Sequence, residues 1–415
     1  MAGAGRLGGA VVPSALRALR IWRAVLTLMV LLWWDGRRWT YPGGCTPERR
    51  EARQQRRARW LTAELLALGS AFIKLGQLLS ARPDVLPAGW VAELADLQDR
   101  VPPFSFDRAQ AVLEEELGAR CAEIIDLDEQ PLGAASLAQV HRASLRSGRQ
   151  VVLKIQRPGL ERVFRLDLEV MQQVAAVLQR HPSWGRGRDW VAIAQECRRV
   201  LLRELDFRVE AQYAARFRQQ FLEDPRIRVP GVIWELSSRR VLCLDYLPGI
   251  KVNDREALLA AGIDPAAVAE IGAASYLQQL VRYGFFHADP HPGNLAVASD
   301  GALIYYDFGM MGLLSDGLRR RLGAMVRAAA TRDASALVNE MQAAGVIARE
   351  VDLGPVESNR SSHHGPDSAG GRRRWHGLGL HLRRGRHHLP VYRRRGPGRP
   401  ALILAPTPLA RAVFP

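Results

Sequence analysis

Lysine is scarce in this chain. Only three of its 58 Lys and Arg residues are lysine: Lys74, Lys154 and Lys251. Arginine is a planar fork, whereas lysine is a compact point charge on a thin stem. A site that must hold one ammonium group between a carboxylate and phosphate oxygens would not accept the planar guanidinium group of arginine. Lys74 and Lys154 lie in motifs described below and are candidates for such sites. Lys251 is more simply explained as a lysine that chance has kept in an arginine-rich chain.

Closely spaced cysteines and long apolar runs are also missing. The four cysteines are far apart and form no Cys-x-x-Cys pair, which argues against structural zinc and a disulfide scaffold and fits a reducing compartment. The apolar run from Ile21 to Trp34 has roughly 14 residues, against about 20 for a helix that spans a bilayer, and no small-residue cleavage site follows it. At 415 residues the chain is still long enough for two or three domains.

The positive charge is concentrated at one end. From Ser358 to Pro415 there are 12 arginines and one acid, Asp367, so this segment carries +11 of the net charge of +16. The rest of the chain is only mildly basic. The tail has no hydrophobic periodicity, and we interpret it as unstructured, from a shifted reading frame or an unrelated fusion. A nucleic-acid-binding arm is the alternative, but its basic residues are interleaved with few aromatics, Trp375 and Tyr392 among them, so nucleic acid is not an expected partner.

The N-terminal part contains one stretch expected to be disordered, followed by several predicted helices. Residues 1–20 are rich in Gly, Ala and Arg and are expected to be disordered. The run from Ile21 to Trp34, with basic flanks, predicts either a helix in a membrane interface or a helix packed on the protein's own body. Residues 47–59 predict an exposed helix or linker. A helix is predicted from Trp60 to Arg82, and a further one over residues 88–99.

The helix over residues 60–82 contains Lys74-Leu75-Gly76-Gln77. Lys74 and Gln77 are three residues apart and share a face. A lysine on an otherwise apolar helix must reach solvent or pair with an acid. We expect Glu204, or else Asp206, to be that acid.

The pattern changes to strands from about Asp107. A small-residue loop precedes two strands, at residues 137–143 and 150–156, and the second strand holds Lys154 among apolar neighbours. A long amphipathic helix is predicted over residues 192–221. On it Asp206 and Glu210 share a face while Glu204 points elsewhere. A buried Lys154 needs an acidic partner, and Glu210 is the candidate.

Further strands are predicted at residues 229–234 and 241–246, and helices at residues 254–284 and 313–344. Between these two helical regions lie the sequences His287-Ala288-Asp289-Pro290-His291-Pro292-Gly293-Asn294 and Asp307-Phe308-Gly309. Two short strands, 295–297 and 303–305, surround an Asp300-Gly301 turn, so the hairpin should bring Asn294 and Asp307 together, with Asp289 beside them. Converging oxygen ligands suit Mg²⁺ and a bound triphosphate, and protein kinases have the same order of residues.

Together these motifs resemble the UbiB family, also called aarF-domain or ADCK-type atypical kinases. The resemblance covers about Trp60 to Pro355, and Ile73 to Phe104 is most similar to the cyanobacterial and plastid branch. Two positions depart from the family: Gly133 stands where alanine is usual, and Ala138 where glycine is usual. The motifs that carry the resemblance are Lys74 to Gln77, the loop Gly133-Ala134-Ala135-Ser136, Lys154, Glu204, Asp206, Glu210, Asp289, Asn294 and Asp307.

The resemblance implies a role for each motif. Asp289 would be the catalytic aspartate, and Asn294 and Asp307 would hold Mg²⁺. Lys154 would contact the phosphates of ATP and pair with Glu210, and the loop Gly133, Ala134, Ala135 and Ser136 would cover the nucleotide. Lys74 and Gln77, near Glu204 and Asp206, would lie over the active site where a kinase binds its peptide substrate and would regulate it.

The fold expected from the resemblance is α+β, a two-lobed protein-kinase-like fold with a helical N-terminal extension. Its expected segments are a disordered or interfacial part (1–59), the helical extension (60–106), the N-lobe (107–249), a partial C-lobe (250–356) and the Arg-rich tail (357–415).

The expected function is an atypical kinase or ATPase that binds Mg-ATP and supports isoprenoid quinone or prenyl-lipid metabolism. It would act in the cytoplasm, peripherally on an inner or thylakoid membrane, with prenyl lipids and lipid-biosynthesis proteins as partners. A true protein kinase and a non-catalytic nucleotide-binding scaffold are the alternatives.

Overall fold

The computed structural model describes residues 14–80, 86–95, 97, 102–181 and 189–346. The chain divides into two compact units, with the boundary after Leu313. All the predicted site residues lie in the first unit. In the described part of the second unit, the helical prediction for residues 313–344 is confirmed by α11 (Asp316–Ala330) and α12 (Ala334–Ala343). The tail predicted for residues 357–415 lies outside the described residues, as do residues 1–13.

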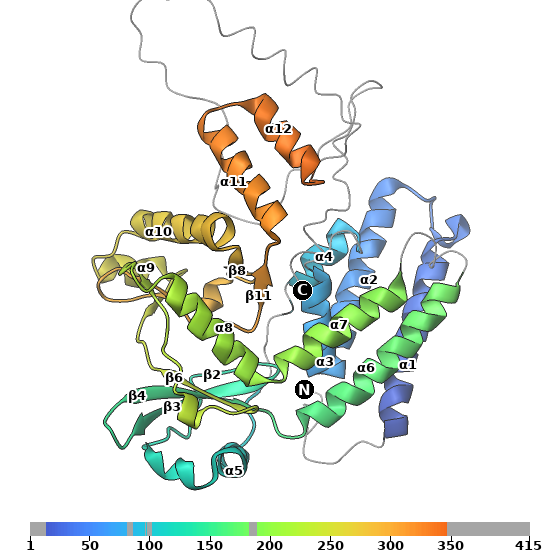
Figure 1. The fold of residues 1–415 in the computed structure, drawn as a ribbon. Coiled ribbons are helices and arrows are strands. Elements are labelled where there is room, and N and C mark those ends of the chain that lie inside the picture. The colour runs from blue at the N-terminus through green and yellow to red at the C-terminus, as the bar shows by residue number, and fades with distance from the viewer. Residues whose placement is uncertain (1–13, 81–85, 96, 98–101, 182–188, 347–415) are drawn as a thin grey trace, which may run out of the picture. The chain divides into compact units, whose positions relative to one another are not determined.

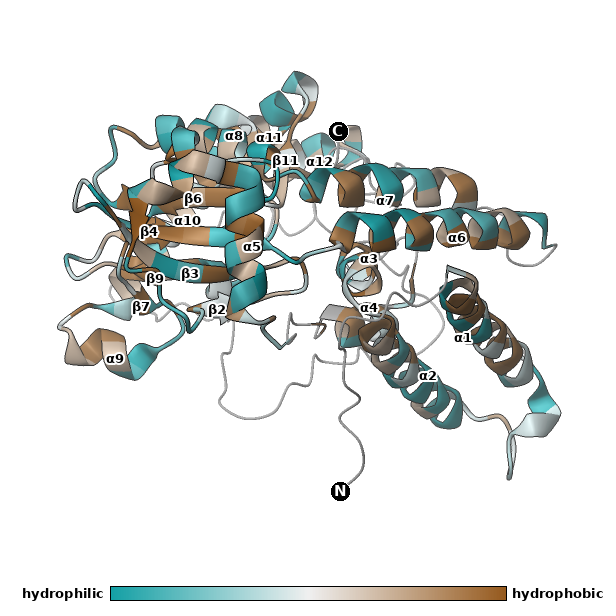
Figure 2. Ribbon diagram, turned by 90° about the horizontal axis from the view of Figure 1, so that it is seen from below, coloured by the Kyte–Doolittle hydropathy of each residue, from teal (hydrophilic) through white to brown (hydrophobic). Residues whose placement is uncertain are grey.

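A helical layer forms the N-terminal part of the first unit (Figure 1). It consists of α1 (Ser14–Asp35), α2 (Pro47–Leu68), α3 (Ser70–Ser80) and α4 (Ala88–Ala95), packed with α6 (Leu160–Arg180) and α7 (Trp190–Glu204). One hydrophobic core joins these helices, with Phe72, Phe164 and Leu201 among its buried members. Figure 2 shows α2 hydrophilic along its first half and hydrophobic along its second half, where it meets the other helices.

The helix boundaries correct several expectations. Residues 14–20, expected to be disordered, form the first turns of α1. The helix predicted over residues 60–82 is two helices, because the chain turns at Gly69, whose φ is +92°, and the first of the two already begins at Pro47. The predicted border at residue 60 therefore falls inside α2.

The first sheet has five antiparallel strands: β1 (Ile124–Ile125), β2 (Gly133–Ala134), β3 (Ala138–Leu145), β4 (Gln150–Gln156) and β6 (Val241–Asp245). Helix α5 (Phe106–Leu117) shares a core with one face of the sheet. The opposite face packs on Phe207 and Ala211 of α8 (Phe207–Gln220). The strands predicted at 137–143, 150–156 and 241–246 are confirmed within two residues, but residues 106–117 are helical where strands were expected.

The second sheet has the order β5-β10-β9-β7, made of Ile227–Arg228, Leu303–Tyr305, Leu295–Val297 and Ile250–Lys251. A separate pair joins β8 (Phe285–His287) to β11 (Met311–Leu313). Helices α9 (Arg255–Ala260) and α10 (Pro265–Leu277), followed by a π-helical turn at Gln278–Tyr283, confirm the helical prediction for residues 254–284.

The strand predicted at residues 229–234 is wrong. In that stretch only Val232 pairs with another strand, through an isolated bridge to Leu244. Pro230 has no N–H to donate to a ladder, which disfavours a regular strand there.

Candidate functional site

Lys154 lies at the centre of a cluster of charges. Side chains alternate along β4, so Leu153 and Ile155 are buried against α5 and Lys154 points to the opposite face, towards α8. Its Nζ lies 2.7 Å from Oε1 of Glu210 and 3.5 Å from Oδ1 of Asp307. Three segments that are far apart in the sequence thus converge on one ammonium group, and the predicted contact between Lys154 and Glu210 is present.

Burial and pairing set the charges of this cluster. Burial alone would lower the pKa of Lys154, but the carboxylates of Asp307 and Glu210 outweigh it and leave that pKa raised. Burial raises the pKa of Glu210 to about 7 despite the ammonium beside it. For Asp307, whose side chain is 41% exposed, partial burial opposes ionisation, but Lys154 and the N–H of Gly309 hold the pKa below its usual range. Asp307 is therefore the carboxylate of the cluster that stays ionised at neutral pH.

Buried side chains beneath the cluster hold Asp307 in place. Phe308 is fully buried and contacts Phe217, with ring centroids 5.4 Å apart. Nδ1 of His287 accepts a hydrogen bond from the N–H of Asp289 at 3.1 Å, so its Nε2 carries the proton and donates to the carbonyl of Asp307 at 2.6 Å. Burial lowers the pKa of His287, which favours this neutral form. One imidazole therefore links the backbones that carry the two aspartates.

Gln279 orients this histidine from the π-helical turn after α10. The Gln279 side chain is fully buried, and its Oε1 accepts the N–H of His287 at 2.9 Å while its Nε2 donates to the hydroxyl of Tyr305 at 3.2 Å. Sequence reasoning did not assign a role to His287 or Gln279. A π-helical turn gives little sequence signal, although such turns are frequent at functional sites.

The hairpin predicted after Asn294 is present as β9 and β10, with Leu295 paired to Tyr305. The N–H of Tyr306 donates to the carbonyl of Asn294 at 3.0 Å, so the two ends of the hairpin meet beside Asp307. Nδ2 of Asn294 donates to the carbonyl of Asp289 at 3.3 Å. Asp289 is exposed and Asn294 half-buried. The structure thus brings Asp289, Asn294 and Asp307 to one place, as the spacing predicted.

The loop predicted to cover a nucleotide is held by its backbone. Gly133 and Ala134 form β2 on the edge of β3, and the N–H of Ala135 donates to the carbonyl of Ala138. The carbonyl of Ser136 accepts a hydrogen bond from Ser70 Oγ at 2.6 Å, which ties the loop to the first residue of α3. A Cβ added at Gly133 would meet no atom within 4 Å, so the glycine is not required by packing. Phosphate binding by this loop stays a prediction.

The second lysine pair joins α3 to α7. Nζ of Lys74 lies 3.4 Å from Oε2 of Glu204, and the side chains are only 16% and 6% exposed. Burial raises the pKa of Glu204, while Lys74 acts against that rise. This ion pair is the one that the sequence predicted.

The other two residues assigned to regulation do not contact Lys74 in this way. Nε2 of Gln77 donates to the carbonyl of Leu97 at 2.9 Å and so fixes the chain after α4. Asp206 caps α8 through the N–H of Arg208 and pairs with the Arg208 guanidinium at 2.7 Å. The single helix predicted over residues 192–221 is therefore two helices, because the Asp206 side chain begins a new one. The break between α7 and α8 separates Glu204 from Glu210, so each acid meets its own lysine.

The donor set fits Mg²⁺ bound together with a nucleotide. Among the described residues, no group of three or more His, Cys, Asp or Glu side chains could hold a metal ion by itself. Asp307 and the Asn294 amide oxygen are hard ligands, and Mg²⁺ commonly completes its shell with water and phosphate oxygens. Asp307 and Asn294 would hold the ion, and Lys154 would contact the phosphates.

The comparisons with known proteins identify the family. A family model described as the ABC1 atypical kinase-like domain matches residues 96–341. The chain belongs to this family. An uncharacterised protein of Synechocystis sp. is 46% identical to it over 342 residues, which cover 82% of this chain and 58% of that protein. The chloroplastic protein Activity of BC1 complex kinase 7 of Arabidopsis thaliana is 43% identical over 329 residues, covering 79% of this chain and 47% of that protein.

Among solved structures, the erythromycin complex of Rv3197 from Mycobacterium tuberculosis matches with a TM-score of 0.53 and 27% identity. The match covers 74% of this chain and 78% of that one. The chain spans about half of the length of the curated relatives it matches. The UbiB resemblance, its cyanobacterial and plastid branch, and the two-lobed kinase-like fold with helices at the N-terminus are therefore confirmed for this ABC1 kinase-like chain.

Proposed function

We propose that this ABC1 kinase-like protein binds Mg-ATP and hydrolyses it or transfers its γ-phosphate, in support of isoprenoid quinone or prenyl-lipid metabolism at a membrane. The observation that carries the proposal is the convergence of Lys154, Glu210 and Asp307, with Nζ–O distances of 2.7 and 3.5 Å. Phosphoryl transfer depends mainly on positioning and on electrostatic stabilisation, which are what such a cluster supplies.

Each residue of the cluster has a distinct part in this proposal. Glu210 positions the Lys154 ammonium, which would contact phosphate oxygens. Asp307 and Asn294 would hold Mg²⁺, whose charge would offset that of the phosphates. Asp289 is exposed at the mouth of the site and would accept the proton of the attacking hydroxyl or water as ADP leaves.

The position of the N-terminal helices favours a substrate other than a protein. Helix α3 is fixed at both sides of the cluster, by Ser70 to the loop at Ser136 and by Lys74 to Glu204. Gly76 lets this helix pack closely on its neighbours, since a Cβ there would lie 2.3 Å from Cδ1 of Leu97. We infer that α3 covers the place where a kinase would bind a peptide, and that its lysine tunes catalysis without performing it.

Helix α1 supports a membrane role, because it is apolar on two opposite faces. One face, including Ile21 and Ala24, is buried against the helical layer. The other face is exposed, with Leu26, Val30 and Trp33 at 54%, 60% and 52%. Within the described residues, no helix combines the length and apolar character needed to cross a bilayer. A helix with an unpartnered apolar face and basic flanks suits the interface of a membrane, and the chloroplastic relatives favour a thylakoid or bacterial inner membrane.

The test combines three assays on the same preparation. Release of phosphate from Mg-ATP is measured with and without anionic liposomes, alongside transfer of labelled phosphate to a panel of proteins. We expect slow phosphate release that liposomes stimulate, with little protein labelling. Efficient labelling of proteins would favour a protein kinase, and nucleotide binding without phosphate release would favour a scaffold.

A further inference from the structure

The helical layer borders a large apolar cavity that is partly open to solvent and lies away from the charged cluster. Its volume is about 740 Å³, and its walls come from α1, α2, α3, α4, α6 and α7. Protein interiors rarely leave voids much larger than a water molecule, whereas ligand sites have volumes of about 300–1,000 Å³ and mostly apolar walls. A space of this size and lining is therefore a candidate ligand site.

The cavity follows helix α1 for most of its length. Residues that line it recur at every turn from Ile21 to Asp35, a stretch of roughly 21 Å at a rise of about 1.5 Å per residue. An apolar cavity of about 150 Å³ holds one benzene ring, so this one could take roughly thirty carbon atoms. The space is therefore long enough and more than wide enough for one extended hydrocarbon chain.

The two ends of the cavity differ. Near one end, Arg17 closes the helical layer: it makes two hydrogen bonds, of 2.7 and 2.6 Å, to the fully buried carboxylate of Asp167 on α6 and one to the carbonyl of Leu68 on α2. The opposite end, where α1 leads into α2, is polar. There Asp35 accepts from both Arg53 and Arg57, and Arg38, Arg50 and Gln54 also line or border the space.

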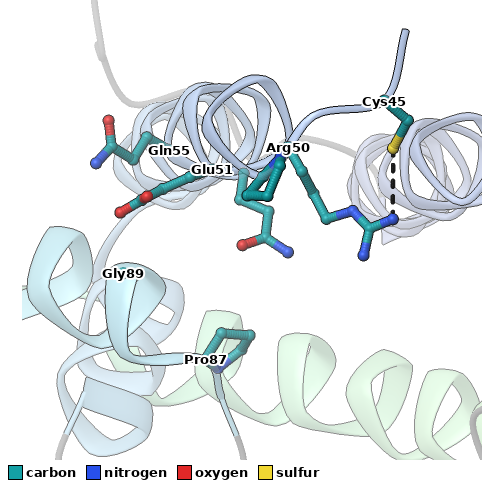
Figure 3. Close-up of a pocket in the computed structure, with 8 residues that line it drawn as sticks. Cys45, Arg50, Glu51, Gln55, Pro87 and Gly89 are labelled. Atoms are coloured by element: carbon teal, nitrogen blue, oxygen red, sulfur yellow. Dashed lines mark hydrogen bonds between the residues drawn. The ribbon is translucent and has the colours of Figure 1, made fainter. Parts of the chain in front are cut away.

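A polar pocket of about 510 Å³ adjoins this polar end (Figure 3). It shares Cys45, Arg50, Gln54 and Pro87 with the apolar cavity, so the two spaces are neighbours. The close-up shows the Arg50 guanidinium turned towards the Cys45 thiol, to which it donates at 3.4 Å. Glu51 and Gln55 lie beside Arg50 on α2, and Pro87 and Gly89 face them. In the linings of the two spaces at this end, Arg38, Arg50 and Arg57 outnumber Asp35 and Glu51, which favours a negative group.

We infer that the helical layer is a binding site for an anionic amphiphile with one long hydrocarbon chain. The chain occupies the apolar cavity along α1, and the head lies in the polar pocket near Arg50. The outer face of the same helix carries Leu26, Val30 and Trp33, so the wall of the cavity is also the surface proposed to meet a membrane. This inference extends the proposed function, because it assigns a binding site to the lipid. The link between that site and the kinase activity rests on the proposed function.

The test uses the full chain, without nucleotide or membranes, and the fluorescent fatty acid cis-parinaric acid. We expect saturable binding with one molecule per chain. Ala175→Phe on α6 and Ala194→Phe on α7 each place a ring in the cavity from a different helix, and each should weaken binding roughly tenfold or more. Ala63→Phe makes the same change on an exposed part of α2 and should bind as the wild type does.

Two further arms define the ligand and the fold. Arg50→Gln changes an exposed side chain, and it should weaken binding of the acid but not of its methyl ester. Competition by stearate and by geranylgeranoic acid, which share a carboxylate head, shows whether the site prefers a straight acyl chain or an isoprenoid. Retention of the wild-type melting temperature, or an increase, in the two cavity variants would show that the space exists, because a filled core would be disrupted by an added ring.

The outcomes separate this inference from the proposed function. Non-saturable binding, or unchanged affinity in both folded cavity variants, would overturn the amphiphile site. Asp307→Asn should leave binding of cis-parinaric acid intact, and the cavity variants should keep their affinity for Mg-ATP. A chain that binds the fatty acid but not Mg-ATP would refute the proposed function and leave the amphiphile site standing.

Discussion

The buried ion pair between Lys74 and Glu204 gives a quantitative test of how the N-terminal helices are held over the charged cluster. At 3.4 Å, two unit charges attract by about 5 kcal/mol at an effective dielectric constant of about 20. Much of this attraction is offset by the cost of burying both groups, so removal of one partner is the informative change. Loss of one member of a buried pair costs about 3–5 kcal/mol, because the other charge is left in a poor environment.

Lys74→Met should therefore lower the free energy of unfolding by about 3–5 kcal/mol at pH 8. The loss should be smaller at pH 6. Burial already raises the pKa of Glu204, and without Lys74 that pKa rises further, so the folded state holds a proton that the unfolded state has lost. Stability of the variant then falls as pH rises towards the new pKa.

The assay is urea unfolding followed by tryptophan fluorescence, for both single variants and for Lys74→Met/Glu204→Gln. The double variant should be more stable than the sum of the single losses predicts, by at least about 1 kcal/mol. Lys251→Met is the matched control, because Lys251 is exposed, and it should stay within about 0.5 kcal/mol of the wild type. Additive effects, or equal losses from Lys74→Met and Lys251→Met, would refute the pair as a structural link.

Three other changes probe the cluster and the membrane face. Lys154→Arg should lower Mg-ATP affinity and turnover in nucleotide-binding and phosphate-release assays, because the planar guanidinium group fits poorly between Glu210 and the phosphates. Wild-type affinity and turnover in this variant would show that Lys154 does not contact the nucleotide. The free energy of unfolding of the wild type, relative to that of Glu210→Gln, should fall by up to about 3 kcal/mol as pH rises from 4.5 to 7. The reason is that folded Glu210, with its raised pKa, keeps a proton that the unfolded chain loses over this range. If urea unfolding gave the same difference between the two proteins at every pH in this range, the raised pKa would be contradicted. The double variant Leu26→Glu/Val30→Glu should float less with anionic liposomes than the wild type does. Flotation equal to that of the wild type would show that α1 only packs on the protein and does not bind the membrane.

Local sequence signals predicted the part of the site that depends on short-range geometry. The Asp300-Gly301 turn and the strands around it fixed the hairpin, and the hairpin brought Asn294 to Asp307. Lys154 and Lys74 could be paired with acids because a buried ammonium needs one. Turn chemistry, strand alternation and the burial of charge are all readable in a single sequence.

Other features depend on side-chain hydrogen bonds that compete with regular secondary structure or join distant residues, and hydrophobic periodicity does not reveal these. The hydrophobic pattern runs through residues 192–221 without a break, but the side chain of Asp206 accepts a backbone N–H and starts a second helix. Gln77 bonds to the distant carbonyl of Leu97, and Gln279 to His287 and Tyr305. Long-range partners of this kind are set by the folded arrangement and leave no mark on local spacing.

The measurement that tests the central claim most directly is calorimetric titration of ATP into wild-type protein and Asp307→Asn, with Mg²⁺ and with a chelator. The account predicts tight binding by the wild type only with Mg²⁺, because the ionised Asp307 carboxylate is the anionic ligand of the site. Asp307→Asn should keep its fold, shown by an unchanged melting transition, and lose the Mg²⁺-dependent part of the affinity. An Asp307→Asn variant that binds Mg-ATP as tightly as the wild type would contradict the account.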